Sequence, residues 1–283
     1  MKKLVIILGV LGVSFSAVFV RITDAPSLVL TFYRSLFAAI FLAPALFVKF
    51  RPELKKLTKK DLLLCVVSGC FLGLHFSAYF ESLRFTSIAS SVVLVDTEVF
   101  FVAFAMLFFF REKISRQGWI GIFLAFAGSV VVAMADAGIG SDILKGDLIA
   151  LSGAAFMAVY TIIGKICRKH MTTTVYTFLV YASSAVTVFV LLLLQKTPVT
   201  GYGPSMFVSS IGMAICCSLL GHSIFSWGLK YEKASFISTV KLLEPVFASV
   251  LGIFLFSEIP GVYTVLGGIV IILGIFIYSK HSE

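Results

Sequence analysis

The sequence predicts an all-α membrane protein whose ten transmembrane helices form two inverted-topology repeats of five helices. Three observations lead to this prediction: the composition, ten long apolar runs, and the similarity between the two halves of the chain. Hydrophobic residues make up 59% of the chain and charged residues 13%, and the mean hydropathy is +1.06. Soluble domains are about 45–50% apolar and about 25% charged. Because so much apolar surface needs lipid to cover it, the composition excludes a soluble domain, a disordered chain and a coiled coil.

Each apolar run is close to the roughly 20 residues that a helix needs to cross a bilayer. The runs cover approximately residues 3–21, 26–48, 61–83, 87–110, 117–135, 146–167, 174–195, 204–229, 235–256 and 260–279. Proline is best tolerated at the start of a helix, and three runs begin beside Pro26, Pro204 and Pro260. The first run follows two lysines and could be read as a signal peptide. We interpret it as a retained helix, because it has a counterpart in the second half.

The distribution of basic residues predicts the orientation. With the amino terminus in the cytoplasm, 17 Lys and Arg residues fall on the inner side and 4 on the outer side, as the positive-inside rule requires. We therefore expect both termini to be cytoplasmic and the protein to lie in the cell membrane. The net charge of +9 is then a topology signal and predicts no nucleic-acid partner. The five cysteines lie in or beside apolar runs without metal-site spacing, so we expect small buried side chains and no metal site.

The two halves of the chain are similar to each other. A shift of 146 residues places Glu98 on Glu244, Gly121 on Gly267 and Gly128 on Gly274. Residues 1–135 and 146–283 are thus predicted to be two copies of a five-helix unit. An odd number of spans per copy inserts the copies in opposite senses, which is a common architecture of transporters that work by alternating access.

Two segments carry a resemblance to a known family. These are residues 74–132 and 221–277, the second of which contains LEPVF at 243–247 and the glycines at 267, 268 and 274. The chain resembles the ten-span, EamA-like branch of the drug/metabolite transporter superfamily. It departs from the family pattern at Val99, where the first half commonly has a proline. The resemblance implies substrates such as amino acids, amines, other polar metabolites or drugs, commonly exported, and no cofactor.

Ionisable side chains within the predicted spans are candidates for function. A charge at the bilayer centre costs about 2.5–3.5 kcal/mol on insertion scales, so such residues are usually paired or face water. The sequence predicts two clusters on opposite sides of the membrane, each with a basic residue, an acid and a histidine. Their members are Arg34, His75, Asp96 and Glu98 in the first half, and His222, Lys241 and Glu244 in the second.

Spacing along the helices suggests a role for each of these residues. Asp96 and Glu98 point about 200° apart on a helix, so we expect Glu98, the repeat partner of Glu244, to face the cavity and Asp96 to pair structurally with Arg34. Lys241 and Glu244 are three residues apart and could neutralise each other. The predicted substrate or proton pathway comprises Glu98, Glu244, His75, Tyr79, His222 and Lys241. The alternative is that these charges only hold helices together.

The leading functional hypothesis is a secondary transporter for a small polar metabolite, with the proton as a candidate coupling ion. The alternatives are a proton-independent uniporter or exchanger, an uptake carrier, a membrane scaffold and a channel. The sequence contains no H-E-x-x-H or G-x-S-x-G motif and no Walker loop, so we predict neither an enzyme nor an ATP-driven pump. Small-residue seams should join helices within one chain or between chains, in a monomer or homodimer. They are formed by Gly118, Gly121, Gly128, Gly267, Gly268 and Gly274.

Overall fold

The computed structural model describes residues 1–86, 88–134, 142–257 and 259–281. In this part of the chain all regular structure is helical, and ten helical segments are long and apolar enough to cross a membrane. The predicted all-α fold with ten membrane spans is thereby confirmed. Seven of these spans are single helices: α1 (Lys2–Arg21), α2 (Ser27–Val48), α4 (Lys59–Ser82), α7 (Arg116–Met134), α8 (Ile143–Cys167), α9 (Thr173–Leu194) and α14 (Val262–Lys280).

The other three spans are interrupted. The fourth consists of α5 (Ile88–Asp96) and α6 (Glu98–Phe110), and the ninth of α12 (Ala234–Lys241) and α13 (Glu244–Phe256). The eighth runs through α10 (Pro204–Gly212), the π-helix η1 (Met213–His222) and α11 (Ser223–Gly228). Short π-helical segments are often found at functional sites.

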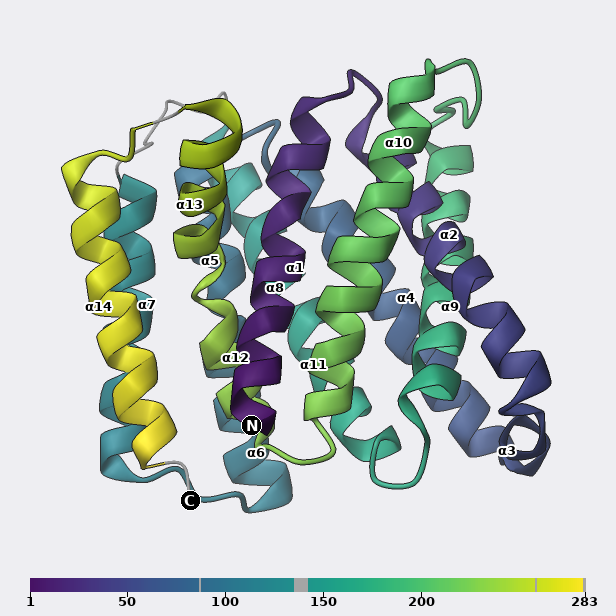
Figure 1. The fold of residues 1–283 in the computed structure, drawn as a ribbon, viewed down its shortest axis with the longest axis horizontal. Coiled ribbons are helices and arrows are strands. Elements are labelled where there is room, and N and C mark those ends of the chain that lie inside the picture. The colour runs from purple at the N-terminus through teal and green to yellow at the C-terminus, as the bar shows by residue number, and fades with distance from the viewer. Residues whose placement is uncertain (87, 135–141, 258, 282–283) are drawn as a thin grey trace.

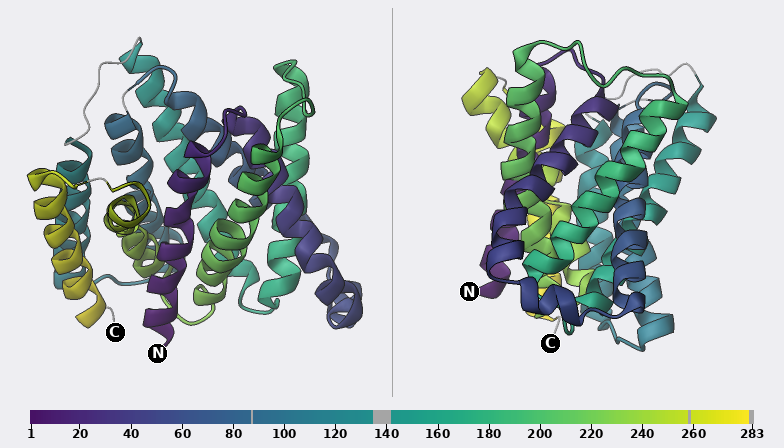
Figure 2. Two further views of the ribbon diagram at one scale, coloured as in Figure 1. Left: turned by 45° about the horizontal axis from the view of Figure 1, so that its top comes forward. Right: turned by 90° about the vertical axis from the view of Figure 1, so that its right-hand side faces the viewer.

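The start of α1 and the end of α14 lie at the same end of the bundle (Figures 1 and 2), which we call the terminal side; the opposite end is the distal side. Lys3 Nζ donates a hydrogen bond to the backbone oxygen of Ser279 over 2.8 Å, so α1 and α14 are tied together there. The short helix α3 (Arg51–Lys56) also lies on the terminal side, between α2 and α4. Thr58 and Asp61 form a capping box that begins α4, as this residue pair does at many helix starts.

The packing of the spans is consistent with an inverted repeat. The first span, α1, packs on η1 in the eighth, while the sixth, α8, packs on α4 in the third. A two-fold exchange of the halves converts the first contact into the second. The second span also packs on the seventh and the fifth on the tenth, as α2 with α9 and α7 with α14.

Close glycine contacts join α7 and α14 within the chain, as predicted. A Cβ placed on Gly121 would lie 2.7 Å from the carbonyl oxygen of Gly274, and one on Gly128 would lie 2.7 Å from that of Gly267. Any side chain at these positions would therefore force the two helices apart. The bundle's outer surface is apolar, with side chains such as Phe109, Leu194 and Phe254 largely exposed.

Candidate functional site

The breaks in the fourth and ninth spans bring charged residues of the two halves together. Glu98 is the first residue of α6 and Lys241 is the last of α12. Lys241 Nζ lies 2.9 Å from Glu98 Oε1, and their side chains are only 12% and 7% exposed. At both breaks the backbone forms a hydrogen bond to the residue three positions earlier, as in a 3₁₀ turn. These bonds run from Thr97 N to Leu94 O and from Leu243 N to Val240 O. The site is therefore built on two helix ends inside the bundle, a feature of several transporter folds.

Glu244 begins α13 and is the second carboxylate at a break. The charged side chains whose fields reach it are Arg34, Lys241 and Glu98, but within the described residues none forms an ion pair with it. Ser14 of α1 donates a hydrogen bond to the Glu244 backbone oxygen over 3.2 Å. The sequence suggested neutralisation of Lys241 by Glu244, whereas Lys241 pairs across the repeats with Glu98.

The predicted pair of Arg34 with Asp96 is wrong in this structure. Asp96 accepts a hydrogen bond from Ser129 Oγ of α7. Arg34 Nε donates to Ser218 Oγ of η1 over 2.9 Å. The reason is packing: α2 lies against η1, while α5 lies against α7 and α8. Similar depth in the membrane did not make these two residues neighbours.

Arg34 is almost completely buried, at 4% exposed. Its guanidinium carbon lies 4.3 Å from the centroid of the Phe76 ring, a distance at which a cation is attracted to the face of an aromatic ring. Phe76 also contacts the ring of His222, with 5.4 Å between centroids. Arg34, Phe76 and His222 thus form one wall of the site.

The other predicted pathway residues lie around this wall. His75 is held by α8, since its Nδ1 lies 3.0 Å from the Gly153 backbone oxygen. Tyr79, four residues further along α4, is half-buried, and the charges that reach it are those of Glu244 and Asp96. The structure therefore gathers the expected two clusters into one, because the helix breaks meet in the middle of the bundle.

Sequence reasoning missed several residues of this site. Ser129 and Ser218 bind the two charges that were expected to bind each other. Tyr160 contacts His222, with ring centroids 6.1 Å apart, and shares a hydrogen bond of 3.1 Å with Ser226. Each of these residues carries a hydroxyl within an apolar run, which is a sign of a polar contact. Because such hydroxyls commonly bond to the backbone of their own helix, the sequence does not show which of them bond to another helix.

Packing differs between the two ends of the site. Residues Ala234–Val240 of α12 are all buried, and α12 packs against α6 on the terminal side. In α13, on the distal side, Gly252 is the buried residue, and residues 244–249 are half-buried. The terminal side of the site is therefore closely packed, and the distal side leaves more side-chain surface exposed.

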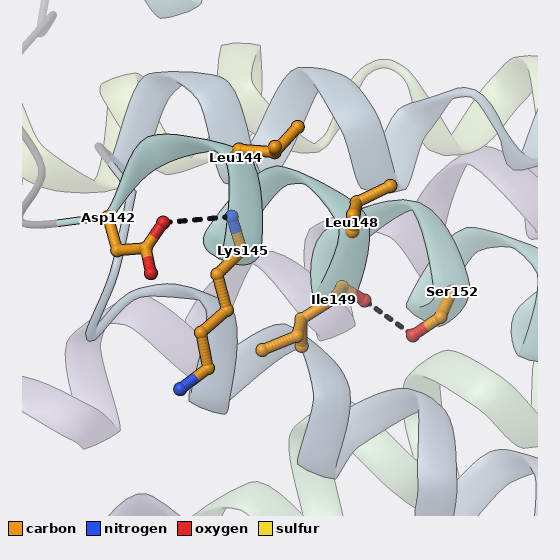
Figure 3. A pocket seen from close by; sticks show the side chains of 6 residues that line it. All are labelled: Asp142, Leu144, Lys145, Leu148, Ile149 and Ser152. Carbon is orange, nitrogen blue, oxygen red and sulfur yellow. Dashed lines mark hydrogen bonds between the residues drawn. The ribbon is translucent and has the colours of Figure 1, made fainter.

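A surface hollow of about 490 Å³ lies elsewhere, on α8 (Figure 3). Its polar groups bond within the helix: Asp142 accepts from the Lys145 backbone nitrogen over 3.3 Å, and Ser152 donates to the Ile149 backbone oxygen over 2.6 Å. Leu144 and Leu148 are exposed. None of the residues that line it belongs to the charge cluster, so this hollow is a feature of the bundle surface.

Comparisons with known proteins agree with this architecture. The model of the EamA-like transporter family matches residues 2–134 and again residues 144–280. An uncharacterised transporter of Archaeoglobus fulgidus is 26% identical over 259 residues, which cover 90% of this chain and 88% of that protein. The pseudopaline exporter CntI of Pseudomonas aeruginosa is 19% identical over 91% of this chain and 88% of its own. A solved crystal structure superposes with a TM-score of 0.82 at 16% identity, covering 99% and 98% of the two chains, and so has the same fold.

Proposed function

Because the chain belongs to the EamA-like transporter family, we propose that it is a secondary transporter that exports a small polar metabolite with a cationic group, an amine or amino acid. It is a multi-pass membrane protein, and its relatives include transporters. The proposed location is the cell membrane with both termini in the cytoplasm. The basic residues of the terminal side support this orientation, and a relative that is named as an exporter supports export.

The observation that carries this proposal is the charge cluster at the two helix breaks. The Lys241–Glu98 ion pair neutralises one cation and one acid. Glu244 and Asp96 remain half-buried carboxylates without an ion pair in the described chain. Two acids without a counter-charge favour a substrate amine, a proton, or both in turn.

Alternating access follows from the repeat architecture. In the state described here, α6 and α12 close the terminal side through the Lys241–Glu98 pair. In the opposite state we expect α5 and α13 to close the distal side and this ion pair to open. Two similar halves facing opposite ways make such a pair of states energetically accessible.

Flux into proteoliposomes tests the proposal. We would measure uptake of amino acids, quaternary amines and sugars, with and without an imposed pH gradient. The expected result is saturable flux of an amine or amino acid that the gradient stimulates and that Glu244→Gln abolishes. The control is Glu232→Gln, the same change in a terminal-side loop, which should leave flux unchanged.

The other outcomes separate the alternatives. Saturable flux that ignores both the gradient and Glu244→Gln would indicate a uniporter or exchanger and contradict proton coupling. Flux that does not saturate would indicate a channel. Folded protein without flux of any compound would contradict the transporter proposal.

A further inference from the structure

Two buried side chains at the charge cluster have hydrogen-bonding capacity that the protein does not use. Arg34 donates from Nε to Ser218, but neither terminal guanidinium nitrogen donates to any residue that the structure describes. His222 is 5% exposed, and its Nδ1 has no hydrogen-bond partner. Buried polar groups are nearly always satisfied, because an unpaired one costs folding free energy. These unused hydrogen-bonding groups lie at the candidate transport site and are therefore available to a ligand.

The two side chains lie at one place. Ser218, the partner of Arg34, is four residues before His222 on η1, which places them about one turn apart on the same helix face. Phe76 contacts both, with its ring 4.3 Å from the Arg34 guanidinium carbon and 5.4 Å from the His222 ring.

The arrangement also has a defined charge pattern. Arg34 carries a buried positive charge, and no described carboxylate forms an ion pair with it. Glu244 of α13 likewise forms no ion pair among the described residues. An unpaired positive group and an unpaired negative group in one cluster match a ligand that carries one charge of each sign.

We propose that Arg34 and His222 form a subsite for the carboxylate of the transported molecule. This proposal rests on the proposed function and narrows its substrate to a zwitterion whose ammonium lies toward Glu244. The planar guanidinium presents parallel N–H groups that fit a carboxylate. His222 in the tautomer with a proton on Nδ1 adds a further donor.

Equilibrium binding to the purified full-length chain tests the subsite. The probes are the twenty standard amino acids, the methyl ester of each, and matched amines that lack the carboxyl group. Apparent affinity is measured from the concentration dependence of thermal stabilisation. We expect at least one amino acid to bind roughly tenfold or more tightly than its ester and its amine, because charged hydrogen bonds are lost with the carboxylate.

Variants then identify the residues that distinguish the amino acid from its ester. Arg34→Gln should reduce the affinity ratio of acid to ester to about one while leaving the ester's affinity unchanged. His222→Phe should reduce the ratio in part. Arg51→Gln makes the same change at an exposed arginine of α3 and should keep the wild-type ratio. If Arg34→Gln does not fold, Arg34→Lys keeps the charge but loses the guanidinium geometry, and it should still lower the ratio.

Each result decides the proposal. Esters or amines that bind the wild-type protein as tightly as the acids would overturn it, as would an unchanged ratio in the Arg34 variants. An intact acid preference in a protein whose flux ignores a pH gradient would contradict proton coupling alone and leave the subsite standing.

Discussion

The two halves of the ninth span, α12 and α13, differ in how deeply they are buried. In α12 the residues Ala234–Val240 are all buried, whereas in α13 Gly252 is the buried one. The first half packs on α6, α1 and α14, and the second mainly on α1. The break at Leu242 and Leu243 separates the two environments. A continuous helix would have to move as one body, but a broken one can remain packed at one end while the other end moves.

The fourth span has a break at the corresponding place. Its terminal-side half, α6, has the buried residues Glu98, Val99, Val102, Ala103 and Met106. In α5, residues 92–96 are half-buried. The two closely packed half-helices, α6 and α12, meet through the Lys241–Glu98 pair. The comparison therefore separates a closely packed terminal side from a distal side whose half-helices are less buried.

We expect the two sides to differ most in how far the loss of a side chain lowers the free energy of unfolding. Phe236 in α12 is 1% exposed, while Phe254 in α13 is 80% exposed. Phe236→Ala should lower the free energy of unfolding by about 3–5 kcal/mol, because it leaves a cavity in the core. Phe254→Ala should change it by less than about 0.5 kcal/mol. Reversible unfolding in detergent checks both, and equal losses would contradict the packing difference.

A smaller effect is expected from the ion pair between the repeats. A double-mutant cycle of Glu98→Gln and Lys241→Met should give a coupling energy of about 1–3 kcal/mol, because the two charges are in direct contact and largely removed from water. The matched cycle pairs Lys241→Met with Glu244→Gln instead of Glu98→Gln; Glu244 lies across the break in the same span as Lys241 but forms no ion pair with it. Its coupling should be smaller. A larger value for Glu244 would show that Lys241 has a different partner in solution.

Much of the fold could be predicted from the sequence, because lipid imposes length and composition on every span. The helix breaks were harder to predict. Pro245 marks one of them, whereas Val99 beside the other gives no such signal. The charged side chains that the structure brings together could be named from the sequence, but their bonding partners could not. Arg34 and Asp96 lie at similar depths, yet which helix each one faces depends on packing between distant segments, and a single sequence does not show that packing.

Chemical labelling tests the central claim most directly. Ala248 of α13 lies four residues after Glu244 and Ser238 of α12 three residues before Lys241, so each shares a helix face with its charge. We would introduce Ala248→Cys or Ser238→Cys into a chain whose five native cysteines are replaced, and follow reaction with a polar maleimide in lipid nanodiscs, where both sides meet water. The closely packed terminal side predicts that the cysteine at 248 reacts about tenfold or more faster, because position 238 reacts only after local opening. Glu98→Gln should narrow the difference. Equal rates, or faster reaction at 238, would contradict the account.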